Sequence, residues 1–286
     1  MASFAIVVHH LRREALQTAD EAIGWLTAKG HEVRLPRADA EAAGRPDLGW
    51  EPEKLAGGLN LAVSLGGDGT MLRTVELVAE ESVPVLGVNI GQLGYLTELE
   101  PAQLRPALKR FLAGEYGIEE RMRLAVEVAA PSGSVAPGMY GALNEAAAEK
   151  PSAGHTIRVA VSINGEFFTT YAADGLIVAT PTGSTAYAFS VRGPIVSPRH
   201  LALIMTPVSP HMLFDRSLVL DPDETIRLEI IDDRSAMLTI DGRELGMLGR
   251  GDAITCTCAP QPARLVSFEP RHFHRLIKAK FGLADR

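Results

Sequence analysis

The chain has little cysteine, no long apolar run and no excess of positive charge. Its two cysteines, Cys256 and Cys258, stand two residues apart in the segment TCTC, where a strand would point both side chains the same way. A zinc or redox site would usually need a CxxC pair with further ligands. Both cysteines are therefore predicted to be reduced residues of the core.

No apolar run reaches the roughly 20 residues that span a bilayer, and the start MASFAIVVHH lacks the basic segment that opens a signal peptide. No membrane contact is expected, and a cytoplasmic location is the default. A net charge of −7 and a pI near 5.7 argue against a surface for nucleic acid or anionic lipid. An anionic ligand would have to be held by locally placed donors.

The 286 residues are long for one hydrophobic core, so two domains are expected. Residues 1–117 alternate strand and helix patterns, which predicts a parallel α/β sheet. Its expected strands include Phe4–Val8, Leu61–Leu65 and Val83–Val88. The stretch Pro36–Pro52 is rich in Ala, Gly, Pro and acidic residues and is predicted to be a mobile loop.

Residues 118–268 follow a different pattern, in which apolar residues fall on alternate positions, as at Leu124, Val126 and Val128. The pairs Asn164-Gly165 and Asp241-Gly242 are strong signals for two-residue hairpin turns. This part is predicted to be an antiparallel β-sandwich. Residues 269–286 hold a short helix, expected to pack back onto the first domain.

The segment GGDGT, from Gly66 to Thr70, directly follows the apolar run Leu61–Leu65. Glycines let backbone N–H groups meet phosphate oxygens closely, and the helix expected from Thr70 and Met71 adds a positive N-terminus there. Asp68 places one carboxylate among these donors. A tight turn without a ligand could also use two glycines, but the position after a parallel strand favours a phosphate site. The P-loop and GxGxxG patterns are both absent.

Two further segments carry polar groups. The adjacent amide and carboxylate of Asn144 and Glu145 could bind the vicinal diol of a ribose, although an exposed pair at a strand end is the simpler interpretation. The segment TPTGST, Thr180 to Thr185, gathers four hydroxyl residues and a glycine after the apolar run Leu176–Ala179. Ser184 or Thr185 is expected to cap a following helix. A structural cap and a nucleotide cradle fit this segment equally well.

Taken together, these motifs resemble the NAD kinase family. The resemblance rests on GGDGT, LNE, and DGLIVATPTGSTAYAFS followed by GPIV, in this order, and it extends to PVLGVNIGQLGYL at Pro84–Leu96. GGDGT alone is shared with diacylglycerol-type lipid kinases and phosphofructokinases. The Asn-Glu pair and TPTGSTAY single out the NAD kinases. The implied fold is a Rossmann-like parallel α/β domain followed by an all-β domain.

The resemblance also implies roles for individual residues. Asp68 would take the proton from the adenosine 2′-hydroxyl of NAD or hold metal, Gly69 would touch the ligand, and Arg73 would face phosphate. The glycine turn, Gly66, Gly67, Gly69 and Thr70, would hold the phosphates of ATP. Further NAD contacts are implied at Asn144, Glu145, His155, Asp174, Thr185, Ala186, Tyr187, Ala188, Phe189 and Ser190, with Asp174 reaching across a subunit boundary.

Three positions depart from the family pattern. Ala172 stands where many relatives have a basic residue, and Arg192 replaces a small residue before Pro194. Arg243, a possible additional contact, stands where relatives often have glutamine. These changes bear on how phosphates are neutralised and which donor is used.

The expected activity is phosphorylation of NAD by ATP or another phosphoryl donor, with Mg²⁺ or another divalent metal held mainly through the donor phosphates. A homodimer or homotetramer is expected because an antiparallel sheet exposes edges that need covering. Two alternatives stay open: a lipid kinase that shares GGDGT, and a catalytically silent dinucleotide-binding regulator.

Overall fold

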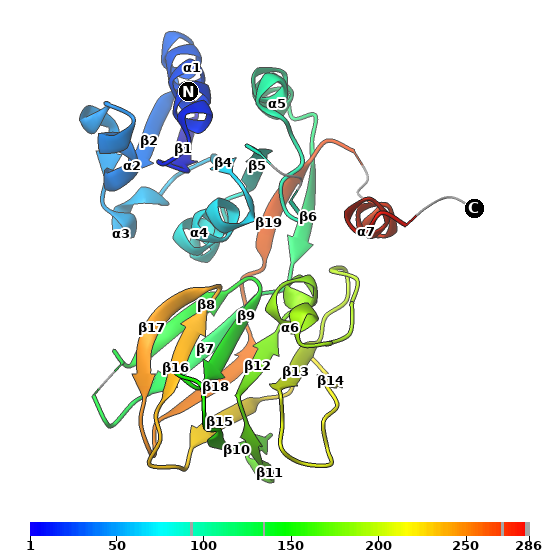
Figure 1. Ribbon diagram of the computed structural model, residues 1–286. Coiled ribbons are helices and arrows are strands. Elements are labelled where there is room, and N and C mark those ends of the chain that lie inside the picture. Colours follow the sequence, from blue (N-terminus) through cyan, green and yellow to red (C-terminus); the bar gives the residue numbers. More distant parts are fainter. Residues whose placement is uncertain (92–93, 134, 270–271, 284–286) are drawn as a thin grey trace. The chain divides into compact units, whose positions relative to one another are not determined.

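The computed structural model describes residues 1–91, 94–133, 135–269 and 272–283 (Figure 1). Contacts divide the chain into two compact units: Met1–Glu120 with Gln261–Arg286, and Arg121–Pro260. Each unit has its own hydrophobic core. No helix in these described ranges is long and apolar enough to cross a bilayer.

The first unit is built on a seven-stranded sheet in the order β3-β2-β1-β4-β5-β19-β6. The pairings from β3 through to β19 are parallel. The strands are β1 (Ser3–Val8), β2 (Glu32–Pro36), β3 (Gly49–Trp50), β4 (Leu61–Gly66), β5 (Val85–Asn89), β6 (Gly117–Arg121) and β19 (Ala263–Ser267). Every residue of β4 is buried, as expected for a strand covered on both faces.

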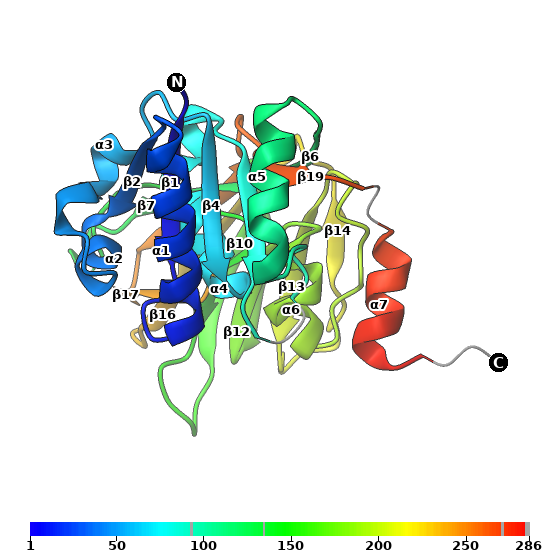
Figure 2. The same cartoon turned by 90° about the horizontal axis from the view of Figure 1, so that it is seen from above.

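Helices cover both faces of this sheet. α1 and α5 lie on one face and α4 on the other (Figures 1 and 2). The helices are α1 (Arg13–Ala28), α2 (Arg37–Ala42), α3 (Pro52–Leu55), α4 (Asp68–Val78), α5 (Leu104–Leu112) and α7 (Phe273–Phe281). α1 buries Ala15, Ala19, Ile23 and Leu26, which recur at helical spacing on one side. α7 belongs to the first unit, and its Lys280 ammonium lies 4.7 Å from the ring centroid of Tyr95.

Two local predictions for this unit are wrong. The stretch Pro36–Pro52 is not a loop, because it contains α2, a 3₁₀ turn and β3. Its Asp39 is fully buried and accepts hydrogen bonds from the backbone N–H of Val8 and from Arg73, and such distant partners leave no mark on local composition. The helix after the glycine turn also begins earlier than expected, at Asp68, with Gly67 at its N-cap.

The second unit contains two six-stranded antiparallel sheets, in the orders β11-β10-β15-β18-β7-β8 and β14-β13-β12-β9-β16-β17. The first comprises β7 (Leu124–Ala129), β8 (Gly138–Ala142), β10 (Ile157–Ile163), β11 (Glu166–Ala173), β15 (Ile226–Ile230) and β18 (Ala253–Cys258). The second comprises β9 (Glu145–Glu149), β12 (Gly175–Ala179), β13 (Leu203–Val208), β14 (Leu218–Leu220), β16 (Ala236–Ile240) and β17 (Arg243–Leu248). Buried residues of both sheets form one core, so the unit is a sandwich.

The two hairpin signals are confirmed, and the predicted core position is confirmed for Cys256, while Cys258 is half-buried. Asn164-Gly165 joins β10 to β11 and Asp241-Gly242 joins β16 to β17, and all four residues have positive φ, as the favoured two-residue turn requires. Cys256 and Cys258 are free, and burial raises the pKa of the Cys256 thiol to about 12. A thiol this hard to ionise is a core group and not a nucleophile.

Candidate active site

The glycine turn of the first unit presents one fixed carboxylate. Asp68 lies in the first turn of α4, where its Oδ2 accepts a hydrogen bond from the backbone N–H of Tyr95 at 2.8 Å and its Oδ1 accepts one from that of Leu96 at 3.0 Å. A Cβ on Gly94 would lie 2.2 Å from Asp68 Oδ1, so this approach requires glycine. The segment after β5 therefore sets the orientation of the Asp68 side chain. Residues 92 and 93 of this segment lie outside the described residues.

The three glycines of the turn have different surroundings. A Cβ on Gly66 would lie 2.2 Å from Thr70 Oγ1, so the first glycine is needed for packing within the turn. Gly67 and Gly69 face open space, with nothing within 4 Å of a Cβ built there. The turn therefore leaves room beside the helix N-terminus, where backbone N–H groups favour an anion.

This room forms part of a hollow of about 410 Å³, which we call the glycine-turn hollow. Its lining includes Gly67, Gly69, Arg73, His9, His10 and Arg12. The last three are not among the residues predicted from the sequence. They follow β1, whose carboxyl end lies beside that of β4 because the two strands pair in parallel. Basic residues directly after a strand that neighbours a glycine turn were the available signal.

Arg73 lines this hollow, but much of its guanidinium is already engaged. Nη1 donates to Asp39 Oδ1 at 2.8 Å, and Nη2 donates to Asp39 Oδ2 and to the carbonyl of Val8, both at 2.7 Å. Three of the five N–H donors of the guanidinium are thus used inside the unit. The buried Asp39 fixes Arg73 at the edge of the hollow through a two-pronged ion pair.

In the second unit, Asn144 directly precedes β9 and Glu145 is its first residue. The Glu145 side chain is buried, and its Oε2 has no hydrogen-bond partner among the described residues. Burial, with the negative charges of Asp241 and Glu149, raises its pKa to about 8, against the lowering effect of a hydrogen bond from the Tyr187 backbone. At neutral pH this carboxyl is mostly protonated, so it can donate as well as accept a hydrogen bond.

The hydroxyl-rich segment after β12 forms a 3₁₀ turn and then α6 (Tyr187–Ser190). The prediction of a Ser184 or Thr185 cap is wrong, because no side chain caps α6. Ser184 Oγ instead donates to the carbonyl of Pro181 at 2.7 Å and accepts from the N–H of Val196, and Thr185 Oγ1 donates to the carbonyl of Thr182. These hydroxyls stabilise the turn itself.

Other predicted residues lie around β9 and β12. The Tyr187 hydroxyl donates to the carboxylate of Glu149, and burial together with this carboxylate raises the pKa of Tyr187. Asp174 directly precedes β12 and pairs with Lys150 at 2.7 Å. The carboxyl groups of Asp174 and Glu145 also contribute to the raised pKa of Tyr187, so the structure brings these three predicted residues together.

The remaining predicted residues have varied surroundings. Ala188 is fully buried in a small apolar cluster with β12 and β13, so its side chain packs against the sheet. Phe189 and Ser190 are exposed and Ala186 is half-buried. His155 is half-buried in the connection between β9 and β10, and Arg243 begins β17 with an exposed side chain. Arg192 adopts a φ of +66°, a conformation that residues other than glycine rarely adopt.

Comparison with known proteins gives one consistent answer. The family model "ATP-NAD kinase N-terminal domain" matches residues 51–116, and "ATP-NAD kinase C-terminal domain" matches residues 143–268. The NAD kinase of Heliobacterium modesticaldum is 40% identical over 284 residues, which cover 98% of each chain. The chain belongs to the NAD kinase family.

Solved structures agree with this assignment. Yeast NADH kinase complexed with NADH has a TM-score of 0.89 at 25% identity, covering 100% of this chain and 89% of that one. An NAD kinase from Archaeoglobus fulgidus in complex with ATP has a TM-score of 0.72 at 26% identity, covering 99% and 98%. The predicted family and fold class are confirmed. Because the likeness covers both units and not the glycine turn alone, it decides against the lipid-kinase alternative.

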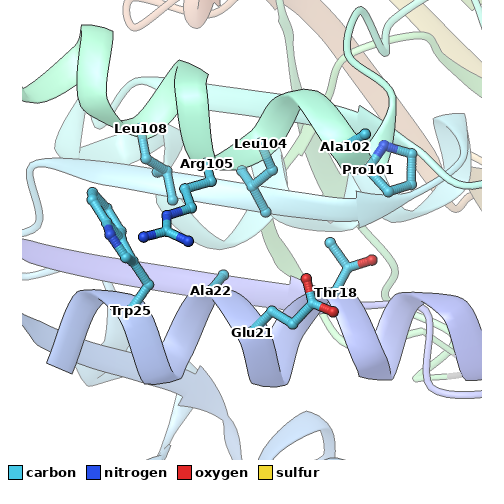
Figure 3. A pocket seen from close by; sticks show the side chains of 9 residues that line it. All are labelled: Thr18, Glu21, Ala22, Trp25, Pro101, Ala102, Leu104, Arg105 and Leu108. Carbon is cyan, nitrogen blue, oxygen red and sulfur yellow. The ribbon is translucent and has the colours of Figure 1, made fainter. Parts of the chain in front are cut away.

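A second hollow of about 410 Å³ in this member of the NAD kinase family lies between α1 and α5 (Figure 3). Trp25 and Arg105 face each other across it, with the guanidinium carbon of Arg105 5.9 Å from the centroid of the indole. It contains none of the residues predicted for the active site.

Proposed function

We propose that this chain transfers the γ-phosphoryl group of ATP, or of another phosphoryl donor, to the 2′-hydroxyl of the adenosine ribose of NAD, which gives NADP. The family assignment makes the chain an NAD kinase. The single observation that carries the residue-level mechanism is the Asp68 carboxylate, fixed by two backbone N–H groups in a turn whose Gly67 and Gly69 face open space.

Asp68 would act as the proton acceptor. The bond between the γ-phosphorus and its bridging oxygen breaks as a bond from the ribose oxygen forms, and the hydroxyl proton passes to Asp68. Each carboxylate oxygen of Asp68 accepts one backbone hydrogen bond and keeps a further lone pair for that proton. Phosphoryl transfer depends mainly on positioning and charge stabilisation, which a carboxylate held from two sides supports.

The donor phosphates would occupy the glycine-turn hollow. It combines the open faces of Gly67 and Gly69 with His9, His10, Arg12 and Arg73. This local group supplies positive charge and N–H donors in a chain whose net charge is −7. Because Asp39 already restricts the Arg73 side chain, binding a phosphate would cost Arg73 little further conformational entropy.

The second unit would bind NAD. Asn144 and Glu145 would hold the adenosine ribose and select the 2′-hydroxyl over the 3′-hydroxyl, and Thr185 to Ser190 would line the adenine, with Tyr187 as an aromatic wall. The hydrogen bond from Tyr187 to Glu149 restricts this ring, which supports the role. The buried, unpartnered Oε2 of Glu145 needs a hydrogen-bond partner, and a ribose hydroxyl is one.

A divalent cation such as Mg²⁺ would neutralise the negative charge of the donor phosphates. Within the described ranges no three His, Cys, Asp or Glu side chains gather into a group that could hold a metal ion. This fits Mg²⁺, which commonly binds through one or two carboxylates plus substrate phosphates and keeps several waters. Asp68 is the carboxylate that the glycine turn offers for this role.

The chain would act as a homodimer or homotetramer in which Asp174 contributes to a neighbouring site. Several large apolar side chains on and beside the edge strands β11 and β14 are exposed: Phe167, Phe168, Leu213, Phe214 and Val219. The rings of Phe168 and Phe214 contact each other edge to face, with centroids 5.9 Å apart. An apolar group at sheet edges favours association with a second copy. Light scattering should give a mass above that of one chain, and a fully active monomer would contradict the proposal.

The function is tested by incubating the purified full chain with ATP, Mg²⁺ and either NAD or diacylglycerol, and by assaying each phosphorylated product. NADP should form from NAD, and excess EDTA should stop its formation. Turnover of diacylglycerol but not NAD would overturn the assignment. NAD binding without any NADP would instead support the silent regulator.

A further inference from the structure

The conformation of the turn Asp241-Gly242 does not by itself require an aspartate at its first position. Asp241 has a φ of +49° and begins the two-residue turn between β16 and β17. The matching turn Asn164-Gly165 has φ values of +53° and +80°. Asn, Asp and Gly all suit this position, so the hairpin alone does not explain an aspartate.

The Asp241 carboxylate accepts hydrogen bonds from three successive backbone N–H groups about 97 residues earlier in the chain. The N–H of Leu143 donates to Oδ2 at 2.7 Å, and those of Asn144 and Glu145 donate to Oδ1 at 2.7 and 3.1 Å. The N–H of Asp241 donates in return to the Glu145 carbonyl at 2.9 Å. Successive N–H groups aimed at one anion form a concavity that usually holds a ligand, and here it holds a side chain.

The same three residues are held from the other side by the segment after β12. The N–H of Thr180 donates to the Asn144 carbonyl at 2.8 Å, and Thr180 Oγ1 donates to the Leu143 carbonyl at 2.6 Å. A Cβ on Gly183 would lie only 2.1 Å from the Asn144 carbonyl oxygen. The backbone of Leu143–Glu145 is thus enclosed between Asp241 and this segment, which leaves it little freedom to turn its side chains.

We propose that Asp241 is a positioning residue for NAD. Its carboxylate fixes the backbone of Asn144 and Glu145, so that their side chains are already oriented when the ribose binds. This inference rests on the proposed function of the Asn144–Glu145 pair. Asp241 acts through that pair and through its charge, which adds to the electrostatic environment of the Glu145 carboxyl. Orienting the pair in advance lowers the free-energy cost of binding NAD.

The decisive variant is Asp241→Asn. The turn should survive, because Asn164 occupies the equivalent position of the other hairpin. The amide has one oxygen and an NH₂ group, which would face an N–H donor, so the three hydrogen bonds cannot all be kept. The KM for NAD should rise about tenfold, the order typical when a residue that orients a binding group is lost, while kcat and the KM for ATP change little. Asn164→Asp is the matched control and should leave both KM values unchanged.

A second readout separates positioning from general damage to the fold. Because Asp241 contributes to the raised pKa of Glu145, Asp241→Asn should lower that pKa, while Glu149 and Tyr187 still act on it. Carbon NMR of the Glu145 carboxyl, assigned with Glu145→Gln, measures this without substrate. If Asp241→Asn does not fold, Asp241→Gly suits the same turn and should give both effects.

An unchanged KM for NAD in folded Asp241→Asn or Asp241→Gly would overturn the inference, even if the melting temperature fell. A rise confined to the KM for ATP would also overturn it. Failure of the proposed function looks different, because the wild-type chain would then form no NADP while the Glu145 pKa could still shift in the variants.

Discussion

The glycine turn of the first unit and the Asn144–Glu145 turn of the second are each organised by an aspartate that accepts backbone N–H groups from a distant segment. Asp68 receives two, from Tyr95 and Leu96, and Asp241 receives three. The two turns differ, because Gly67 and Gly69 leave open space beside Asp68, whereas Gly183 closes tightly on Asn144. The space beside Asp68 lets its carboxylate take part in chemistry. The three backbone hydrogen bonds that Asp241 accepts support its proposed role in positioning other groups.

Asp68→Asn tests this contrast with the largest expected effect. Asparagine keeps the size of the side chain but cannot accept the proton, and loss of general-base help typically costs about 10²–10⁴ in rate. NAD should bind within a modest factor of wild type, because its proposed contacts lie in the second unit. Single-turnover rates and NAD titrations on the same preparation measure both quantities. Near-wild-type turnover of the folded variant would remove Asp68 from the mechanism.

Gly94→Ala moves the same carboxylate without changing it. The new Cβ would lie 2.2 Å from Asp68 Oδ1, so the side chain or the Tyr95–Leu96 segment must shift. A displacement of about 1 Å can cost on the order of 10²-fold in rate, and kcat should fall by roughly that factor. The matched control is Gly24→Ala in α1, where nothing lies within 4 Å of the new Cβ. Equal activity of the two variants would show that the position of Asp68 does not matter.

Glu145→Ala should act on binding more than on turnover. Removing a group that binds the ground state and the transition state equally changes mainly KM. The KM for NAD should therefore rise about tenfold with kcat nearly constant. Steady-state kinetics over a range of NAD concentrations at fixed ATP measures both constants. If kcat collapsed while KM stayed the same, Glu145 would belong to the chemistry, and the contrast between the two turns would fail.

Glu145→Gln tests the pH dependence of stability. The folded-state pKa of Glu145 is about 8, above its ordinary value of 4.5, so the fold favours the protonated form. The contribution of this carboxyl to stability is complete below pH 4.5 and is lost as pH rises toward 8, with each pKa unit worth about 1.4 kcal/mol. Glutamine does not titrate, so the variant should lose less stability than wild type over this range. Urea unfolding of both proteins at pH 5 and pH 8 measures the change in the free energy of unfolding. The same change in variant and wild type would contradict the raised pKa of Glu145.

Much of the fold could be predicted because it follows local pattern. The alternation of strands with helices gave the parallel sheet, and the positive φ needed at Asn164-Gly165 and Asp241-Gly242 gave both hairpins. The errors have different causes. The Pro36–Pro52 segment is organised by the buried Asp39, whose partners Val8 and Arg73 are distant in the chain and leave no mark on local composition. The hydroxyls of Ser184 and Thr185 donate to carbonyls three residues earlier, in competition with the capping role that propensity favours.

The family, the fold class and the candidate residues could be predicted, because they depend on motifs and on hydrophobic periodicity, which are local in the chain. The groups that each candidate contacts depend on the tertiary fold. In the structure Arg73 is already paired with Asp39, and His9, His10 and Arg12 lie beside the glycine turn. Three backbone N–H groups donate hydrogen bonds to Asp241. The physical reason is that hydrogen bonds and burial depend on groups brought together from distant positions, and those groups set the orientation and the charge of each side chain.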